Sequence, residues 1–288
     1  MSDPAPIEVV VGAAGNPNEA LMRACAFGDL EAARGALAAG AAVDFTDATA
    51  PEDVDDTPYF HMSALHVAAD SGASEICALL LDRDAEIECR DPNDSTPLHL
   101  AAEKNHLDCV RLLVSRGADV AAIGSGYRSA FQEAVLAHRF EMAELLLASG
   151  ADIEQPGGGL QPRQVLFAAV MQKNIPAVRW LLEKGADPYR PCPTRYTAAG
   201  EAPRNAVQQA AISRLTPVEV FCAFLEFGID PDKEFDADLS GTCDPRPVRV
   251  IVQDDGNEAA AAALQAFEAK QALERAMNSN KKVAKLAA

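Results

Sequence analysis

A spacing of about 33 residues between similar segments constrains the fold of this 288-residue chain more than any other feature. Leu65 and Leu98 are 33 residues apart, and a further 33 residues reaches Phe131. Leu166 follows after 35 residues. A repeated unit of this length cannot bury its apolar face alone, so neighbouring units must stack to form a continuous core. The spacing therefore predicts a solenoid of stacked units.

Within each unit the sequence predicts two helices. Thr96 can cap the start of a helix, and Pro97 suits the first turn because its missing N–H would have no partner there. Segment 107–114 carries an apolar stripe at helical spacing, and Gly117 follows it where a left-handed residue ends a helix. Aromatic residues make up only 6% of the chain. An alanine- and leucine-rich composition of this kind favours closely packed helices.

The segment Thr96-Pro97-Leu98-His99-Leu100-Ala101 and the recurring Gly-Ala-Asp at 117–119, 150–152 and 185–187 resemble the ankyrin-repeat family. The resemblance covers 18–230 closely and 240–276 loosely. It implies an all-α solenoid of stacked helix pairs with short β-turn fingers. We expect six repeats within 17–235, at about 17–50, 61–93, 94–126, 127–161, 162–197 and 204–235.

The remaining segments depart from this pattern. Residues 1–16 are expected to form a disordered tail, 236–277 a degenerate capping repeat with an alanine-rich helix, and 278–288 a short basic tail. Residues 248–252 are β-branched and fit a helix or a short strand equally well. The alanine-rich helix either caps the solenoid or docks onto a partner. Asp84 stands where other repeats place a helix-ending glycine.

The charge balance bears on the kind of partner. With 43 acidic and 25 basic residues, the chain carries a formal charge of −18. Binding to nucleic acid or to an anionic membrane requires lysine and arginine, so neither partner is expected. The charge favours a protein with a basic or mixed surface, although it would also serve solubility alone.

The seven cysteines are odd in number and scattered, which is typical of small buried residues in a reducing compartment. No segment has the pattern of a secretory signal or of a membrane span. We therefore expect a cytoplasmic monomer.

No motif predicts catalysis, and the repeats leave no segment long enough for a catalytic domain. His66 and His99 occupy the family's structural histidine position, so no enzyme, cofactor or metal site is expected. Residues 236–247 copy part of a calcium loop, but Pro247 replaces the final bidentate glutamate. Calcium modulation is therefore a less favoured alternative.

The resemblance implies a binding surface on the concave face, built from finger tips and the exposed ends of first helices. The matching positions are Tyr59, Phe60, Met62, Asp70, Asn93, Ser95, Glu103, Lys104, Tyr127 and Arg128. Tyr, Phe and Arg residues are common interface anchors. Alternatively, Tyr59, Phe60 and Met62 fold back under the acidic segment 44–59, and Tyr127-Arg128 is a solvated turn.

These observations predict a non-enzymatic protein-binding module that acts as an adaptor, scaffold or regulator. A secreted bacterial effector that acts on a host protein is the alternative within the same class.

Overall fold

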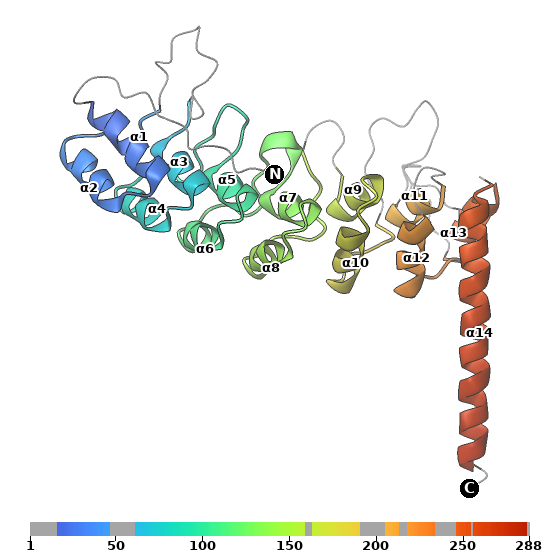
Figure 1. The fold of residues 1–288 in the computed structure, drawn as a ribbon. Coiled ribbons are helices and arrows are strands. Elements are labelled where there is room, and N and C mark those ends of the chain that lie inside the picture. The colour runs from blue at the N-terminus through green and yellow to red at the C-terminus, as the bar shows by residue number, and fades with distance from the viewer. Residues whose placement is uncertain are drawn as a thin grey trace, which may run out of the picture. The chain divides into compact units, whose positions relative to one another are not determined.

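The computed structural model describes residues 16–46, 61–158, 163–190, 205–212, 218–233, 246–254 and 256–286, with side chains up to Met277. The chain divides into two compact units, Met1–Asp152 and Ile153–Ala288. The described residues form α-helices, one short 3₁₀ turn and three isolated β-bridges (Figure 1). The all-α class expected from the sequence is confirmed.

In the first unit the helices are α1 (Pro17–Phe27), α2 (Leu30–Ala38), α3 (Ala64–Ser71), α4 (Ser74–Leu81), α5 (Pro97–Glu103), α6 (Leu107–Ser115), α7 (Ala130–Leu136) and α8 (Phe140–Ala148), with the 3₁₀ turn η1 (Ser125–Tyr127). The second unit contains α9 (Val165–Met171), α10 (Ile175–Glu183), α11 (Ala206–Ile212), α12 (Val218–Glu226), α13 (Val248–Asp254) and α14 (Glu258–Leu286).

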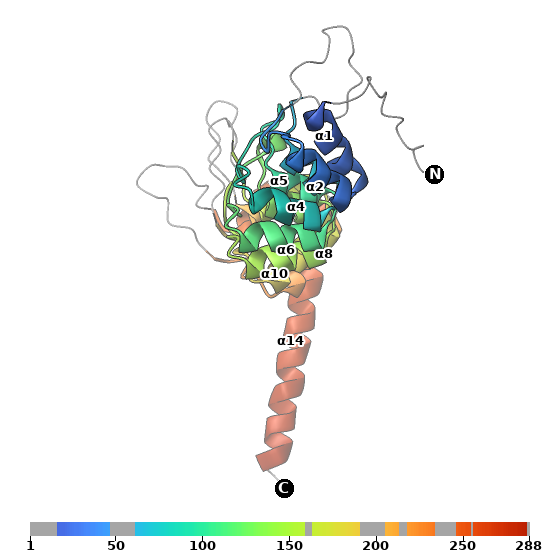
Figure 2. The same cartoon turned by 90° about the vertical axis from the view of Figure 1, so that its left-hand side faces the viewer.

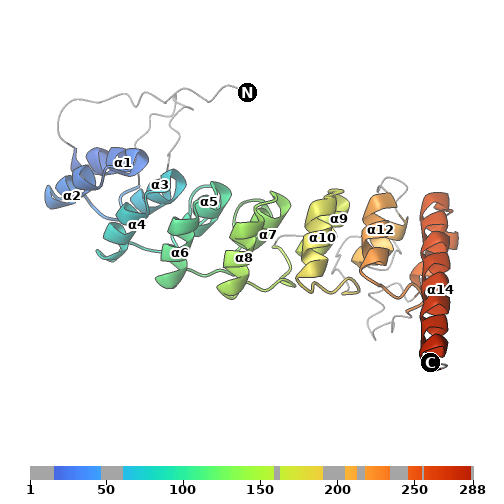
Figure 3. The same cartoon turned by 60° about the horizontal axis from the view of Figure 1, so that its bottom comes forward.

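The first unit is built from two rows of helices. The first helices of successive repeats, α1, α3, α5 and α7, pack side by side, and so do the second helices α2, α4, α6 and α8 (Figure 3). Leu21, Leu65, Leu98 and Phe131 are fully buried at equivalent positions of the first helices. The residues that define the repeat in sequence therefore form the continuous core that stacking requires.

Hydrogen bonds at the helix starts explain the repeated motif. Ser63 and His66 form a reciprocal capping box: the Ser63 N–H donates to His66 Nδ1 and the His66 N–H donates to Ser63 Oγ, both at 3.3 Å. Thr96 with His99 and Ser129 with Gln132 repeat this arrangement. Each box satisfies donors that a helix start leaves without partners.

The helix ends require left-handed backbone. Asp84 has a φ of 62° at the position where Gly117 has 93° and Gly150 has 99°. Aspartate tolerates this region better than most residues, which explains how the second repeat does without the glycine.

In the second unit, α9 and α11 pack together, as do α10 and α12, and α13 packs on α11. The helix α14 packs on α12 and α13 with its N-terminal part, and its C-terminal part extends beyond the other helices of the unit (Figure 2). Residues 248–254 are helical rather than extended. The basic segment predicted as a separate tail continues α14 as far as Leu286.

Candidate protein-binding face

The finger before α5 is held by one buried carboxylate. Asp91 Oδ1 accepts hydrogen bonds from the backbone N–H of Asn93 at 2.9 Å and of Ser95 at 2.7 Å. The Asp91 N–H also donates to the Ser95 carbonyl at 3.0 Å. Because the turn is fixed from within, Asn93 at its tip is exposed on a rigid support.

The finger before α7 presents an aromatic ring. The Gly124 N–H donates to the Arg128 carbonyl at 2.9 Å, which closes the turn. Tyr127 lies at its tip, where its side chain is 65% exposed and its φ is 61°. A left-handed tyrosine is uncommon and costs backbone energy. Arg128 Nη1 lies 2.9 Å from Glu133 Oε2 at the start of α7, so the finger is tied to the helix that follows it.

The ends of neighbouring first helices form a row that contacts join from one helix to the next. Lys104 Nζ lies 3.6 Å from Asp70 Oδ1, which joins the end of α5 to the end of α3. His106 Nε2 lies 3.0 Å from the Asp70 carbonyl oxygen. The Ser71 hydroxyl donates to the Cys25 carbonyl at 2.7 Å, which joins α3 to α1. Glu103 is exposed in the same row.

Phe27 belongs to this row, but it was not predicted from the sequence as a binding residue. It is the last residue of α1, and its side chain is 64% exposed. An offset of 77 residues aligns Leu21 with Leu98, and it also aligns Phe27 with Lys104. Applying that offset to the predicted binding position Lys104 would have identified Phe27 in the first repeat. We use the term finger face for Phe27, Asp70, Asn93, Glu103, Lys104, Tyr127 and Arg128.

Two predicted residues do not lie on this face. Met62 is buried immediately before α3, and Ser95 is buried at the base of its finger. Both sit one residue before the helix cap, where the chain turns into the core, so their placement at exposed finger positions was wrong. Tyr59 and Phe60 lie outside the described residues.

Ser63, His66 and Cys89 combine residue types that occur in catalytic sites, but their contacts stabilise the helix start and the neighbouring finger. Ser63 Oγ lies 2.9 Å from His66 Nδ1 and 3.2 Å from Cys89 Sγ. Burial raises the pKa of the Cys89 thiol to about 11 and lowers the pKa of His66. The second ring nitrogen of His66 is 3.1 Å from the Ser95 carbonyl oxygen. A protonated thiol beside an imidazole engaged on both sides is not an activated nucleophile.

The described residues contain no group of three metal-ligating side chains close enough to hold an ion. The calcium-like segment lies almost entirely outside the described residues, but its last position is described. The Pro247 carbonyl accepts from the backbone N–H groups of Val250 and Ile251 at the start of α13. This residue has no side-chain oxygen to offer a cation.

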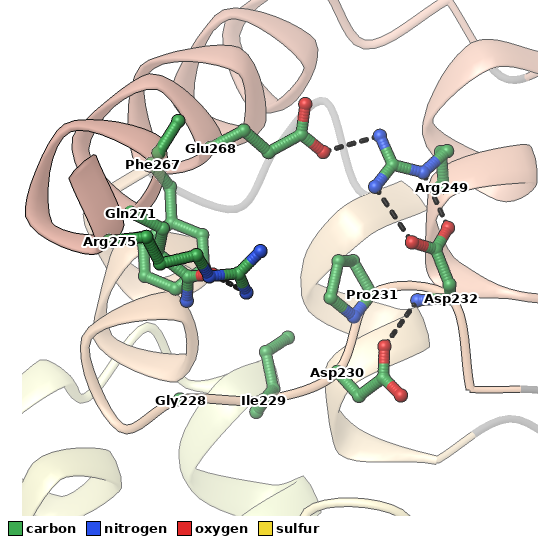
Figure 4. Close-up of a pocket in the computed structure, with 11 residues that line it drawn as sticks. Gly228, Ile229, Asp230, Pro231, Asp232, Arg249, Phe267, Glu268, Gln271 and Arg275 are labelled. Carbon is green, nitrogen blue, oxygen red and sulfur yellow. Dashed lines mark hydrogen bonds and ion pairs between the residues drawn. The ribbon is translucent and has the colours of Figure 1, made fainter. Parts of the chain in front are cut away.

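A separate cleft of about 520 Å³ opens in the second unit between the end of α12, α13 and α14 (Figure 4). Arg249 lies between the carboxylates of Asp232 and Glu268. The hydrogen bonds that Arg249 donates to Asp232 raise its pKa most, and the interaction with Glu268 raises it further. Phe267 and Arg275 line the opposite side of the cleft. The Arg249 charge is thus largely used in holding α13 to its neighbours.

Comparison with known families agrees with the geometry. The family model for ankyrin repeats, which describes three copies, matches residues 21–124 and, in an overlapping second match, residues 65–157. No curated protein matches the chain. Among the described residues, no helix combines the length and apolarity that crossing a bilayer requires.

Proposed function

This chain is an ankyrin-repeat protein, and we propose that it acts as a non-enzymatic adaptor or regulator that binds a protein partner through the finger face. Ankyrin repeats are generally protein–protein interaction modules. The five described cysteines are free, which agrees with a reducing compartment, and we propose a cytoplasmic location.

The observation that carries this proposal is the position of Tyr127. Its ring is exposed on a finger whose backbone is closed by hydrogen bonds, although the left-handed conformation there would suit glycine better. Strained backbone that supports an exposed aromatic side chain is typical of binding sites rather than of solvated turns. The equally exposed Phe27 adds a second apolar anchor within the same unit.

The charges of the finger face favour a partner of mixed polarity. Lys104 pairs with Asp70, and Arg128 pairs with Glu133. Exposed pairs of this kind contribute little to stability, about 0–1 kcal/mol each. They nevertheless place charges of both signs on the finger face, which can steer a partner that also carries both signs.

The test uses affinity purification with mass spectrometry, followed by titration of the captured partner. The double variant Phe27→Ala/Tyr127→Ala should weaken binding by at least about 2 kcal/mol while the helical circular dichroism signal stays intact. Phe227→Ala is the matched control, because Phe227 is also an exposed aromatic residue but follows the second helix α12.

The variant Tyr127→Gly separates binding from folding. Glycine adopts a positive φ without strain, so this change should keep or raise the melting temperature while it weakens binding. Unchanged affinity in both folded variants would contradict the proposed face.

A further inference from the structure

The helix α14 has two different faces. On one face Ala260 and Leu264 are buried, and Phe267 and Gln271 are half-buried. This face packs against α12 and α13. The opposite face is exposed along its whole described length. Its residues are Ala262, Ala266, Ala269, Leu273 and Ala276.

The spacing of the exposed face is that of a coiled-coil seam. The intervals between its residues are four, three, four and three, which is the heptad pattern that keeps one stripe facing a partner helix. In the sequence the pattern continues through Asn280 and Val283, and α14 stays helical over both. We call these seven positions, from Ala262 to Val283, the seam.

The composition of the seam indicates selection for a contact. None of its seven positions is charged, although α14 carries eight charged residues between Glu258 and Lys285. Leu273 is 62% exposed, and Met277, beside the seam, is 52% exposed. Alanine at most other seam positions lets two helices approach closely. An asparagine at one seam position is a known device for specifying how helices pair.

We propose that the seam pairs with the seam of a second copy of this chain, in antiparallel orientation, to form a symmetric dimer. The same surface on both copies then makes the interface, as two-fold symmetry requires. This proposal replaces the monomer expected from the sequence, and it is independent of the finger face.

Charge favours a second copy and sets the orientation. From residue 275 onward the charged residues of α14 are all basic: Arg275, Lys281, Lys282 and Lys285. From 258 to 274 three are acidic, Glu258, Glu268 and Glu274, and one is basic, Lys270. Parallel pairing would place the two basic ends together. Antiparallel pairing places each basic end beside the acidic half of the other helix, and it also aligns the helix dipoles favourably.

The first experiment measures the mass of the full chain by sedimentation equilibrium over a range of concentrations. We expect the wild type to dimerise reversibly, and Leu273→Glu to raise the dissociation constant at least about tenfold, because two carboxylates would enter the seam. Asn278→Glu is the matched control: it adds the same charge to the same helix at a heptad position on the opposite face, and should leave the dimer unchanged.

Disulfide trapping then tests the orientation. In an antiparallel pair, position 273 of one copy faces position 276 or 269 of the other, so a mixture of Leu273→Cys chains with Ala276→Cys or Ala269→Cys chains should form mixed disulfides. A parallel pair would instead link Leu273→Cys chains to one another. Mass spectrometry of the linked peptides separates these products from links between native cysteines.

A wild type that stays monomeric at every concentration would overturn the proposal, and so would a dimer that Leu273→Glu leaves intact. A monomer whose captured partner is lost with Leu273→Glu would also overturn it, because the seam would then serve a different protein.

Discussion

The helix start at Ser63 in the first unit and the one at Asn205 in the second unit are capped by the same pattern of hydrogen bonds, although the side chains differ. At the first, His66 Nδ1 accepts the Ser63 N–H at 3.3 Å and Nε2 reaches the Ser95 carbonyl at 3.1 Å. At the second, Gln208 Oε1 accepts the Asn205 N–H at 3.1 Å and Nε2 donates to the Arg246 carbonyl at 3.2 Å. Both side chains cap their own helix and hold the finger of the next repeat.

This comparison shows that the fold constrains the hydrogen bonds more tightly than the residue types. A neutral histidine ring and a glutamine amide each present an acceptor and a donor at the end of the side chain. The family match ends at residue 157, yet the capping box persists at Asn205. Phe167 differs from both. It occupies the equivalent position in α9 and is buried, but its side chain has no polar atom to cap the helix or to bind the next finger.

The largest expected effect comes from removing the helix that closes the second unit. Deleting 257–288 uncovers α12, where Phe221 and Phe224 are fully buried, and loses the buried Leu264. The free energy of unfolding should fall by at least about 3 kcal/mol, and the protein should aggregate. Thermal melts and light scattering measure both effects.

Deleting only 273–288 is the control for this truncation, because it keeps the contacts of Ala260, Leu264 and Phe267. At low protein concentration its melting temperature should match that of the full chain. If the long truncation stays equally stable and monomeric but loses its partner, α14 is a binding element and not a cap.

The second prediction exchanges the capping residues between the two units. His66→Leu leaves the Ser63 N–H unpaired in the core and removes one of the two hydrogen bonds to the Ser95 carbonyl, which should cost about 2–3 kcal/mol. His66→Gln restores both hydrogen bonds in the manner of Gln208 and should cost less than about 1 kcal/mol. Urea midpoints distinguish the two variants, and equal losses would show that packing, not hydrogen bonding, accounts for the stability that His66 contributes.

The sequence predicted the repeats because their cause is local. Leu65, Leu98 and Phe131 recur at a fixed interval, and the interval places them at one position of the core. The structural role of His66 and His99 was also predictable, because the signature places each three residues after a capping residue.

The binding face was less predictable because exposure near a helix start changes within one residue. Asp94 is exposed while Ser95, the next residue, is buried, and no periodicity marks that change. The helical conformation of 248–254 was ambiguous for a different reason. Its β-branched residues Val248, Ile251 and Val252 are buried against other helices, so tertiary packing outweighs their local preference.

The pH dependence of stability should separate histidine-capped from glutamine-capped repeats. Burial lowers the pKa of His66 and of His99 below the ordinary value of 6.5. Below pH 6.5 the unfolded chain therefore binds more protons than the folded chain, and the free energy of unfolding falls as the pH drops. Stability should be full at pH 7 and reduced at pH 5, by less than the loss in His66→Leu.

The double variant His66→Gln/His99→Gln should flatten this profile, because glutamine does not titrate. His138→Gln is the control, since His138 is exposed. Urea unfolding at pH 5, 6 and 7 provides the measurement, and a profile that survives the double variant would assign the pH dependence to carboxylates instead.

The smallest expected effect concerns the helix-ending position that differs between adjacent repeats. Asp84 has a φ of 62°, and Gly117 occupies the same place one repeat later with a φ of 93°. Asp84→Gly removes the strain of a side chain in the left-handed region and should stabilise the protein by about 0.5–1 kcal/mol, after the greater flexibility of glycine in the unfolded chain is subtracted.

A β-carbon at Gly117 would meet no atom within 4 Å, so Gly117→Asp should lose a similar amount through backbone strain alone. The double variant should then match the wild type in its urea midpoint, because the two sites lie in separate turns. If Asp84→Gly is destabilising, the Asp84 side chain contributes an interaction that outweighs its strain, and the second repeat has gained rather than lost by its departure from glycine.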